Sequence, residues 1–318
     1  MSKITDQQGR YFKSLRLSVL PYCNLACTYC VDPEAEQYPE LKASLMPKQF
    51  LKLVSALHDV LDLYSIRLTG GEPTLYKALP ELVSRLKDLG IPKVHLTTNG
   101  VYLASQIAAL KAAGLDSINV SIDAIDHTVF QKISRRNKLD AVLEGIDVAI
   151  ASGTEVKLNC TMIKGVNDSE IIPLVLFAKE KRVTIRFLEL MEMGALYSSD
   201  QERLFLSAHH ILDQIRQHYR LRELPRKRSA TARYWETEWG TAIGVIANYS
   251  HPFCSDCNRL RMDYTGTLYG CLSSPKGSSL MKALENGESV RDLLQCEINR
   301  KQAKQFKGSP VVMKAIGG

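Results

Sequence analysis

The stretch SVLPYCNLACTYCVDP, residues 18–33, contains three cysteines within eight positions. Cys23, Cys27 and Cys30 have the spacing C-x3-C-x2-C and follow a short β-rich run at 15–20. Disulfide bonds, a zinc site and an iron–sulfur cluster are the structures that such closely spaced cysteines form. The cellular compartment and the rest of the sequence distinguish among these three.

The start of the chain and its hydropathy predict a cytoplasmic protein. The first ten residues, MSKITDQQGR, are polar and lack the apolar core of a secretory signal. The longest apolar stretch, 171–178, contains a proline and is far shorter than the roughly 20 residues of a membrane-spanning helix. We therefore expect no membrane partner. In a reducing compartment, clustered cysteines favour a metal or redox site over disulfides.

Two further cysteines stand alone in the sequence, Cys160 and Cys296. Free cysteine behaves as a small hydrophobic residue, so we expect both to be buried and inert.

The composition is that of an ordinary globular chain with an excess of positive charge. Of the 318 residues 45% are hydrophobic, and 41 Lys and Arg against 34 Asp and Glu give a net charge of +7. Part of the excess lies in one basic run, which comprises Arg216, Arg220, Arg222, Arg226, Lys227, Arg228 and Arg233. A solvated surface is one interpretation of this run, and a binding site for an anion is the other.

Short β-rich runs alternate with longer segments of helical period. The β-rich runs are 15–20, 66–68, 94–97, 117–122, 156–162 and 184–190. Between them, apolar residues recur on one helical face at 47–64 and at 139–150, and Gly153 is expected to end the second helix. Six strand–helix repeats predict an α/β fold with a parallel sheet, in the form of a partial (β/α)6 barrel resembling the TIM barrel.

The pattern changes after Gly194, where a helical segment, the basic run and a β-rich segment at 234–248 follow one another. We therefore expect a boundary near residue 225. The predicted domains are a partial barrel at 1–225 and a smaller C-terminal region at 226–318. Ligands of parallel α/β sheets bind at the carboxyl ends of the strands, so the polar residues that follow each strand are candidates for the site.

No fourth cysteine or histidine lies near the first triplet. A structural zinc site is normally closed by four ligands. A cubane iron–sulfur cluster takes one thiolate per iron, so three cysteines leave one iron open to another ligand. The spacing C-x3-C-x2-C, with the aromatic Tyr29 before the last cysteine, and TGGEP at 69–73 resemble the two signatures of radical S-adenosylmethionine (SAM) enzymes.

This resemblance implies a partial barrel with a [4Fe-4S] cluster on Cys23, Cys27 and Cys30, and SAM as cofactor. One-electron cleavage of SAM would then give a 5′-deoxyadenosyl radical. Gly70 and Gly71 would let the backbone approach a ligand, and Glu72 would offer a carboxylate to the SAM ammonium. The other candidate cofactor contacts are Tyr29, Thr97, Asn99, Ser121 and Asp123.

A second triplet, Cys254, Cys257 and Cys271, has the spacing C-x2-C-x13-C. Taken alone it also suits zinc, with His251 as a fourth ligand. Followed by NRLR at 258–261, however, it resembles the C-terminal cluster site of the GTP 3′,8-cyclases of molybdenum cofactor biosynthesis. The resemblance includes LTTNG, INVSIDAID, KGVND and IRFLELMEMG, in the same order, and the final Gly-Gly pair.

The second resemblance implies a lyase that converts GTP to 3′,8-cyclo-7,8-dihydro-GTP after the radical removes the ribose C3′ hydrogen. It also implies a second [4Fe-4S] cluster on Cys254, Cys257 and Cys271 that holds the purine, and a catalytic tail, Gly317 and Gly318. The implied substrate-binding residues are Arg16, Arg67, Lys157, Arg186, Arg259 and Arg261. Such cations suit a triphosphate, because the guanidinium fork matches phosphate oxygens.

The implied partners are GTP, an electron donor that the sequence does not identify, the downstream cyclic pyranopterin synthase and a second copy of the chain in a homodimer. No nucleic acid is expected. Ser65 and Tyr76 stand where this family usually has basic residues, and Leu20-Pro21 replaces its usual Thr-Asp pair. One alternative is therefore a radical SAM paralogue that acts on another nucleotide or a peptide. A zinc-dependent nucleic-acid-binding protein is a more distant alternative.

Overall fold

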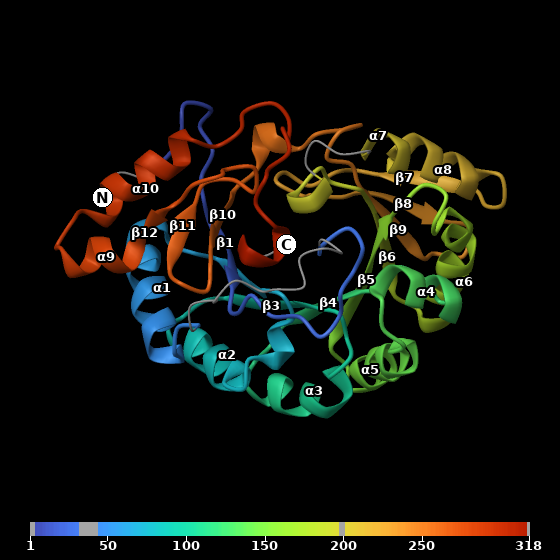
Figure 1. Cartoon of the computed structure of the whole chain (residues 1–318), viewed down its shortest axis with the longest axis horizontal. Coiled ribbons are helices and arrows are strands. Elements are labelled where there is room, and N and C mark those ends of the chain that lie inside the picture. The colour runs from blue at the N-terminus through green and yellow to red at the C-terminus, as the bar shows by residue number, and fades with distance from the viewer. Residues whose placement is uncertain (1–3, 32–43, 197–200, 317–318) are drawn as a thin grey trace.

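The computed structural model describes residues 4–31, 44–196 and 201–316 and shows an open α/β barrel (Figure 1). Its strands form one 12-stranded sheet in the order β12-β11-β10-β1-β2-β3-β4-β5-β6-β9-β8-β7. The six central strands are β1 (Ser14–Ser18), β2 (Ser65–Thr69), β3 (Lys93–Thr98), β4 (Ser117–Ser121), β5 (Glu155–Met162) and β6 (Thr184–Glu189). Neighbours among these six are all parallel, which confirms the predicted partial barrel.

The helices between the central strands lie on the outer side of the curved sheet (Figure 1). They are α1 (Pro47–Leu61), α2 (Leu79–Asp88), α3 (Leu103–Ala112), α4 (His127–Ser134), α5 (Leu139–Ala151) and α6 (Ile171–Lys181). In α1 the predicted apolar stripe is buried: Phe50, Leu53, Val54, Leu57 and Leu61. A side chain of this size contributes about 1.5–3 kcal/mol when it is fully buried.

Alternation along the strands separates the core from the barrel interior. In β5, Val156, Leu158 and Cys160 are buried among apolar side chains, whereas Asn159 and Thr161 alternate with them and line a cavity. Successive side chains of a strand point to opposite faces of its sheet. The apolar set of each central strand therefore packs under the helices, and the polar set faces the interior of the barrel.

The C-terminal part of the chain extends this sheet at both edges. It contains α7 (Gln201–Leu204), α8 (Ala208–Arg216), β7 (Leu221–Leu224), β8 (Arg233–Thr237), β9 (Ala242–Ile246), β10 (Arg259–Met262), β11 (Thr267–Tyr269), β12 (Ser278–Ser279), α9 (Leu280–Glu285), α10 (Val290–Asn299) and α11 (Met313–Ile316). Strand β9 is parallel to β6, and β10 is parallel to β1. Residue 225 falls inside the antiparallel β7–β8 hairpin, and the division into two domains there stays a prediction.

The described part of the chain also contains the 3-10 helices η1 (Pro73–Leu75), η2 (Asp168–Glu170), η3 (Gly194–Leu196) and η4 (Cys254–Asp256). The end of the chain returns to the mouth of the barrel (Figure 1). There Ile316 is buried against Met193 and Phe306. The predicted catalytic residues Gly317 and Gly318 lie outside the described residues.

The two isolated cysteines have different surroundings. Cys160 is fully buried, as predicted, but Cys296 is exposed on α10, so the prediction was wrong for this residue. The buried face of α10 is formed by Leu294, Glu297 and Ile298, and Cys296 lies on the other, solvent-facing side of that helix. In the basic run, Arg222 and Arg233 pair with the carboxylates of Glu236 and Glu223 across the β7–β8 hairpin. None of the helices in the described ranges is long and apolar enough to cross a membrane.

Candidate active site

A cavity of about 510 Å³ lies inside the barrel, along the inner faces of the central strands and at their carboxyl ends. This volume is within the usual range for a small-molecule site. Both cysteine triplets line it, although about 230 residues separate them in the sequence. The lining includes Cys23, Cys27, Cys30, Cys254, Cys257 and Cys271. Within the described ranges, no group of three or more His, Cys, Asp or Glu side chains is arranged to hold a single metal ion.

The first triplet lies in the loop after β1, and backbone hydrogen bonds fix this loop to α4. The amides of Ala26 and Thr28 donate to the carbonyl oxygens of Ser134 and Ile133, at 3.0 and 2.9 Å. On the opposite side, the side-chain amide of Asn99 donates to Asn24 Oδ1 at 2.7 Å, and the same Nδ2 atom lies 3.6 Å from Cys23 Sγ. The loop is therefore anchored at the ends of two different elements of the barrel.

The two glycines after β2 allow this loop to approach the strand. An added Cβ would lie 2.5 Å from the Leu20 oxygen at Gly70 and 2.1 Å from the Tyr22 oxygen at Gly71. The Gly71 amide donates to Leu20 at 2.8 Å. We expected the glycines to admit a ligand, and the structure shows that they admit the backbone of the cysteine loop.

Glu72 is buried in a network of hydrogen bonds. Its Oε1 accepts from the backbone amide and the hydroxyl of Thr74 and from the hydroxyl of Thr98. Its Oε2 accepts from the backbone amide of Asn99 at 2.6 Å. Burial raises the pKa of this carboxyl in spite of those hydrogen bonds. Since Oε2 accepts a single hydrogen bond in this network, it retains acceptor capacity for an ammonium group.

Tyr29 and Asp123 connect the cysteine loop to the end of β4. The Tyr29 hydroxyl donates to Asp123 Oδ2 at 2.7 Å, and the Thr161 amide donates to Oδ1 at 2.7 Å. Burial raises the pKa of Asp123 to about 6. Asp123 therefore holds Tyr29 in place, and of the two only Tyr29 lines the cavity.

The second triplet is flanked by cations. Burial would raise the pKa of Cys257, but Lys301 and Arg259 outweigh it and lower the pKa to about 6. The pKa of Cys271 is also lowered, because Lys301 together with hydrogen bonds from Ser273 and Gln302 outweighs burial. For these two cysteines the surroundings favour the thiolate form, which is the form that ligates metals, whereas burial raises the pKa of Cys254 to about 11. The chemistry of the donor set therefore fits an iron–sulfur cluster at this triplet.

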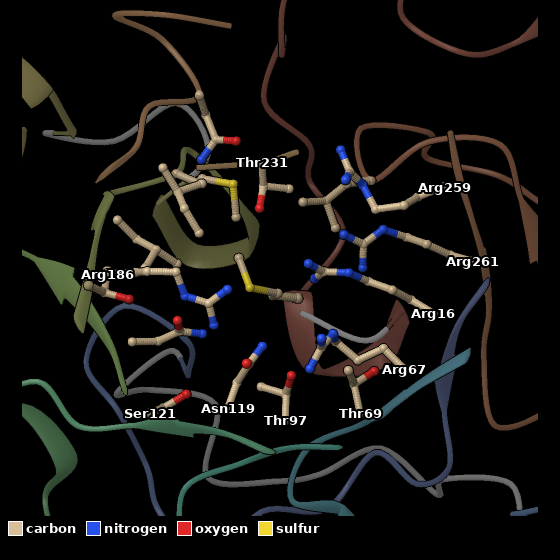
Figure 2. A pocket seen from close by; sticks show the side chains of 18 of the residues that line it. Arg16, Arg67, Thr69, Thr97, Asn119, Ser121, Arg186, Thr231, Arg259 and Arg261 are labelled. Atoms are coloured by element: carbon tan, nitrogen blue, oxygen red, sulfur yellow. The ribbon is translucent and has the colours of Figure 1, made fainter. Parts of the chain in front are cut away.

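Five arginines line the same cavity (Figure 2). The guanidinium groups of Arg16, Arg67, Arg259 and Arg261 point inward from one side, and that of Arg186 points inward from the other. Burial and the neighbouring arginines lower the pKa of Arg16 well below its usual value and that of Arg67 to about 9.

Such a concentration of like charges is unfavourable unless an anion neutralises it. Two unit charges 4 Å apart interact by about 4 kcal/mol at the effective dielectric constant of a partly buried site. Moreover, Nε and Nη2 of Arg186 and Nη2 of Arg259 are buried and have no hydrogen-bond partner within the described part of the chain. Buried donors without a partner are costly, so these atoms fit the oxygens of an anionic ligand.

Lys157 differs from the other predicted substrate-binding residues. Its Nζ pairs with Glu155 Oε1 at 2.6 Å, and the residue does not line the cavity. Asp123 does not line the cavity either, whereas the remaining predicted contacts of known position do: Arg16, Tyr29, Arg67, Gly70, Gly71, Glu72, Thr97, Asn99, Ser121, Arg186, Arg259 and Arg261. No observation assigns a role to any of them, and those roles stay predictions.

Sequence reasoning missed several lining residues. A group on the inner face of the central strands comprises Ser14, Ser65, His95, Asn119, Asn159 and Thr161. Their signal was present, because they alternate with buried apolar residues along each strand. Tyr234, the loop 229–232, which includes Thr231 (Figure 2), and Lys301 also line the cavity. No local pattern marks these, since their place depends on long-range strand pairing.

Of the three departures from the family pattern, Ser65 lies in the cavity lining, whereas Tyr76 and Leu20-Pro21 lie outside it. Ser65 lines the cavity and its hydroxyl lies 2.8 Å from that of Ser14 on β1. Tyr76 lies outside the cavity lining, where its hydroxyl donates to the Leu45 carbonyl at 2.9 Å and its ring packs edge-on against Phe50. Only the Ser65 departure therefore concerns the cavity.

Residues 17–178 match the family model of the radical SAM superfamily. The crystal structure of Streptococcus suis SuiB bound to S-adenosylmethionine shares this fold, with a TM-score of 0.63 and 16% identity over 91% of this chain and 68% of that one. The chain thus belongs to the radical SAM superfamily, which makes it an enzyme with SAM and an iron–sulfur cluster as cofactors. The first predicted resemblance is confirmed.

Residues 183–307 match the model named Molybdenum Cofactor Synthesis C. The GTP 3′,8-cyclase of Staphylococcus saprophyticus is 37% identical over 303 residues, which cover 93% of this chain and 89% of the relative. That of Aquifex aeolicus is 34% identical over 323 residues, covering 99% and 100%. The particular family to which the chain belongs is therefore that of the GTP 3′,8-cyclases, as the second resemblance predicted.

Proposed function

We propose that this protein converts GTP to 3′,8-cyclo-7,8-dihydro-GTP, the first step of molybdenum cofactor biosynthesis. The observation that carries the proposal is the cavity itself, in which two cysteine triplets and five inward-facing arginines meet. Family membership supports the same reaction, since the relatives that cover nearly the whole chain are named for it.

The cavity divides into two halves with different cofactor groups. We assign the first [4Fe-4S] cluster to Cys23, Cys27 and Cys30, and the second to Cys254, Cys257 and Cys271. SAM then lies beside the first triplet, within reach of Glu72, Asn99 and Ser121, which line the cavity there. With the cluster and SAM bound at these residues, the cluster would supply the electron for SAM cleavage, and SAM would supply the 5′-deoxyadenosyl group that takes up the ribose C3′ hydrogen of GTP.

The arginines hold the substrate in the other half. Arg16, Arg259 and Arg261 come from the adjacent strands β1 and β10, whose register aligns Arg16 with Arg261 and places Arg259 two residues earlier. A triphosphate brings about four negative charges, and guanidinium forks bind its oxygens bidentately. Held at the phosphate end, GTP is directed so that its ribose lies between the two triplets.

Enclosure by the barrel is the second contribution of the protein. A carbon radical reacts with many C–H bonds, so selectivity requires the target hydrogen in near-attack contact and the exclusion of water. The inner faces of the central strands, the loop 229–232 and the returning C-terminal segment surround the cavity. From the family resemblance we also propose a catalytic role for Gly317 and Gly318, which follow the buried Ile316 in the sequence.

The remaining parts of the proposal concern the setting of the enzyme. We propose a cytoplasmic homodimer that receives electrons from a separate donor and passes its product to a cyclic pyranopterin synthase. The proposal includes no nucleic acid and no membrane partner. Gel filtration of the anaerobic protein tests the dimer directly.

Anaerobic reconstitution tests the proposed reaction. The chain is loaded with iron and sulfide, supplied with SAM, a reductant and GTP, and assayed by mass spectrometry for 5′-deoxyadenosine and cyclised nucleotide. We expect both products in equal amounts, and SAM cleavage that GTP accelerates. Cleavage of SAM that is indifferent to GTP, with no cyclised nucleotide, would instead indicate a paralogue with another substrate.

A further inference from the structure

Two buried cations near the second triplet have no role in the reaction described above. Arg10 comes from the N-terminal segment and Lys301 from the C-terminal segment, and they are only 3% and 9% exposed. Both lie over the ring of the buried Phe12, at 5.9 and 5.7 Å from its centroid. Burying a charge costs several kcal/mol unless it is paired or hydrogen-bonded. The groups that hydrogen-bond to these two cations therefore indicate their structural role.

Lys301 fixes the backbone on both sides of the triplet. Its Nζ donates to the carbonyl oxygens of Arg259 and Gly270, at 2.8 Å each. Gly270 directly precedes Cys271, and Arg259 is two residues after Cys257. One ammonium group thus joins two cysteine-bearing segments that are well separated in the sequence.

Arg10 fixes the remaining cysteine. Its Nη1 donates to the carbonyl oxygen of Cys254 and, at 3.0 Å, to that of Gln302. The other side of the guanidinium pairs with Asp6 Oδ2, at 2.6 Å from Nε and 2.5 Å from Nη2. Each cysteine of the triplet therefore has a backbone carbonyl, either its own or one within two residues, held by Arg10 or Lys301.

The two cations also differ in where their charge acts. The charge of Arg10 is largely balanced by Asp6, so its main contribution is to geometry. Lys301, in contrast, hydrogen-bonds to neutral carbonyl oxygens and lines the cavity together with the three cysteines, so its charge faces the triplet.

We propose that Arg10 and Lys301 are positioning residues of the second cysteine triplet, which hold its backbone and place a fixed positive charge beside its iron–sulfur cluster. This inference rests on the proposed function, because it requires a cluster at this triplet. A fixed positive charge stabilises the reduced, more negative state of a cluster and so raises its reduction potential.

The test uses full-length chains with K301Q, K301R, R10Q or R10K, and K304Q as a matched control, since Lys304 is exposed and close in sequence. After anaerobic reconstitution, iron and sulfide are measured, and SAM cleavage shows that the first cluster and the fold are intact. The potential of the second cluster is titrated by electron paramagnetic resonance in chains whose first triplet is replaced by alanine.

Loss of a group that orients a metal ligand lowers metal affinity by about 10- to 100-fold. We therefore expect K301Q and R10Q to lose iron from the second site, and K301Q also to lower its potential. K301R and R10K should retain both properties, and K304Q should match the unaltered chain. Unaltered iron content and potential in K301Q and R10Q would overturn the inference. A single cluster in the unaltered chain would instead refute the proposed function.

Discussion

The two cysteine triplets line one cavity in different electrostatic surroundings. Burial, reinforced by Glu72, raises the pKa of Cys23 to about 11, and burial with Asp123 raises that of Cys27 well above its usual value. At the second triplet burial also raises the pKa of Cys254 to about 11, but Lys301 and Arg259 lower that of Cys257 to about 6. One half of the cavity therefore suits a cationic ligand such as SAM, and the other suits anions.

The largest expected effects come from replacing one cysteine of either triplet, because the two replacements should affect SAM cleavage differently. Cys27→Ala should abolish both SAM cleavage and the cyclised nucleotide, because the first cluster loses a ligand. Cys257→Ala should abolish the nucleotide and leave slow SAM cleavage that GTP no longer accelerates. Quantifying both products by mass spectrometry distinguishes these outcomes. Cys296→Ser is the matched control, since Cys296 is exposed and should be silent. Cyclised nucleotide from Cys257→Ala would contradict the assignment.

The next largest effect is expected at Arg186, whose Nε and Nη2 are buried without a partner among the described residues. Arg186→Gln removes charge-assisted hydrogen bonds worth about 1.5–3 kcal/mol, which corresponds to roughly 10- to 150-fold weaker GTP binding. Anaerobic calorimetry measures this affinity, and SAM affinity should stay constant. Arg85→Gln, on the outer helix α2, is the control. Equal loss of SAM binding would show that the arginine-rich half of the cavity is not separate from the SAM site.

A smaller effect is expected from the strand neighbour of Arg186. Gly244 pairs with both Arg186 and Tyr234, and an added Cβ would lie 2.7 Å from Arg186 Cγ and 2.9 Å from Tyr234 Cε1. Gly244→Ala should cost about 1–3 kcal/mol of stability by overpacking. GTP binding should weaken as the guanidinium shifts, while SAM cleavage without GTP should continue. Urea denaturation and calorimetry measure the two effects, and normal GTP affinity would argue against a role for Arg186.

The smallest predicted effect is a pH dependence of stability at His95. This residue lines the arginine-rich half of the cavity, and its Nδ1 lies 2.8 Å from Ser117 Oγ. Burial, followed by the charge of Arg67, lowers its pKa from 6.5 to about 4. Between these values the unfolded state binds more protons, so stability should fall as pH decreases from 6.5 to 4. Partial exposure limits the loss to about 2 kcal/mol or less.

Comparison of denaturation curves for the unaltered chain and His95→Gln isolates this contribution. The difference in stability between the two should be constant above pH 6.5 and change below it. A difference that stays constant to pH 4 would show that burial and the charge of Arg67 do not lower the pKa of His95.

The central strands and the first triplet could be predicted from the sequence because their signals are local. Alternation identifies each strand, and the spacing of Cys23, Cys27 and Cys30 is fixed by the loop that carries them. The same alternation contained the inner polar faces, including Asn119 and Asn159, although only residues near strand ends were identified.

The second half of the cavity depends on pairings that no local pattern specifies. Strand β10 lies beside β1, and this brings Arg259 and Arg261 next to Arg16. Arg10 and Lys301 carry no motif, and their importance follows only from the carbonyls they contact. The exposed Cys296 shows the opposite limit, because a general preference of cysteine for burial does not fix the face of a helix.

Magnetic coupling between labelled ligands and the two clusters tests directly whether each cysteine triplet carries a cluster that binds a different ligand. SAM labelled with nitrogen-15 in its amino group and GTP labelled in its guanine base are bound, one at a time, to chains in which one triplet or the other is replaced by alanine. We expect SAM to couple only to the cluster of the first triplet, Cys23, Cys27 and Cys30. GTP should couple only to the cluster of the second triplet, Cys254, Cys257 and Cys271. Zinc at either triplet, or GTP that couples to neither cluster, would contradict it.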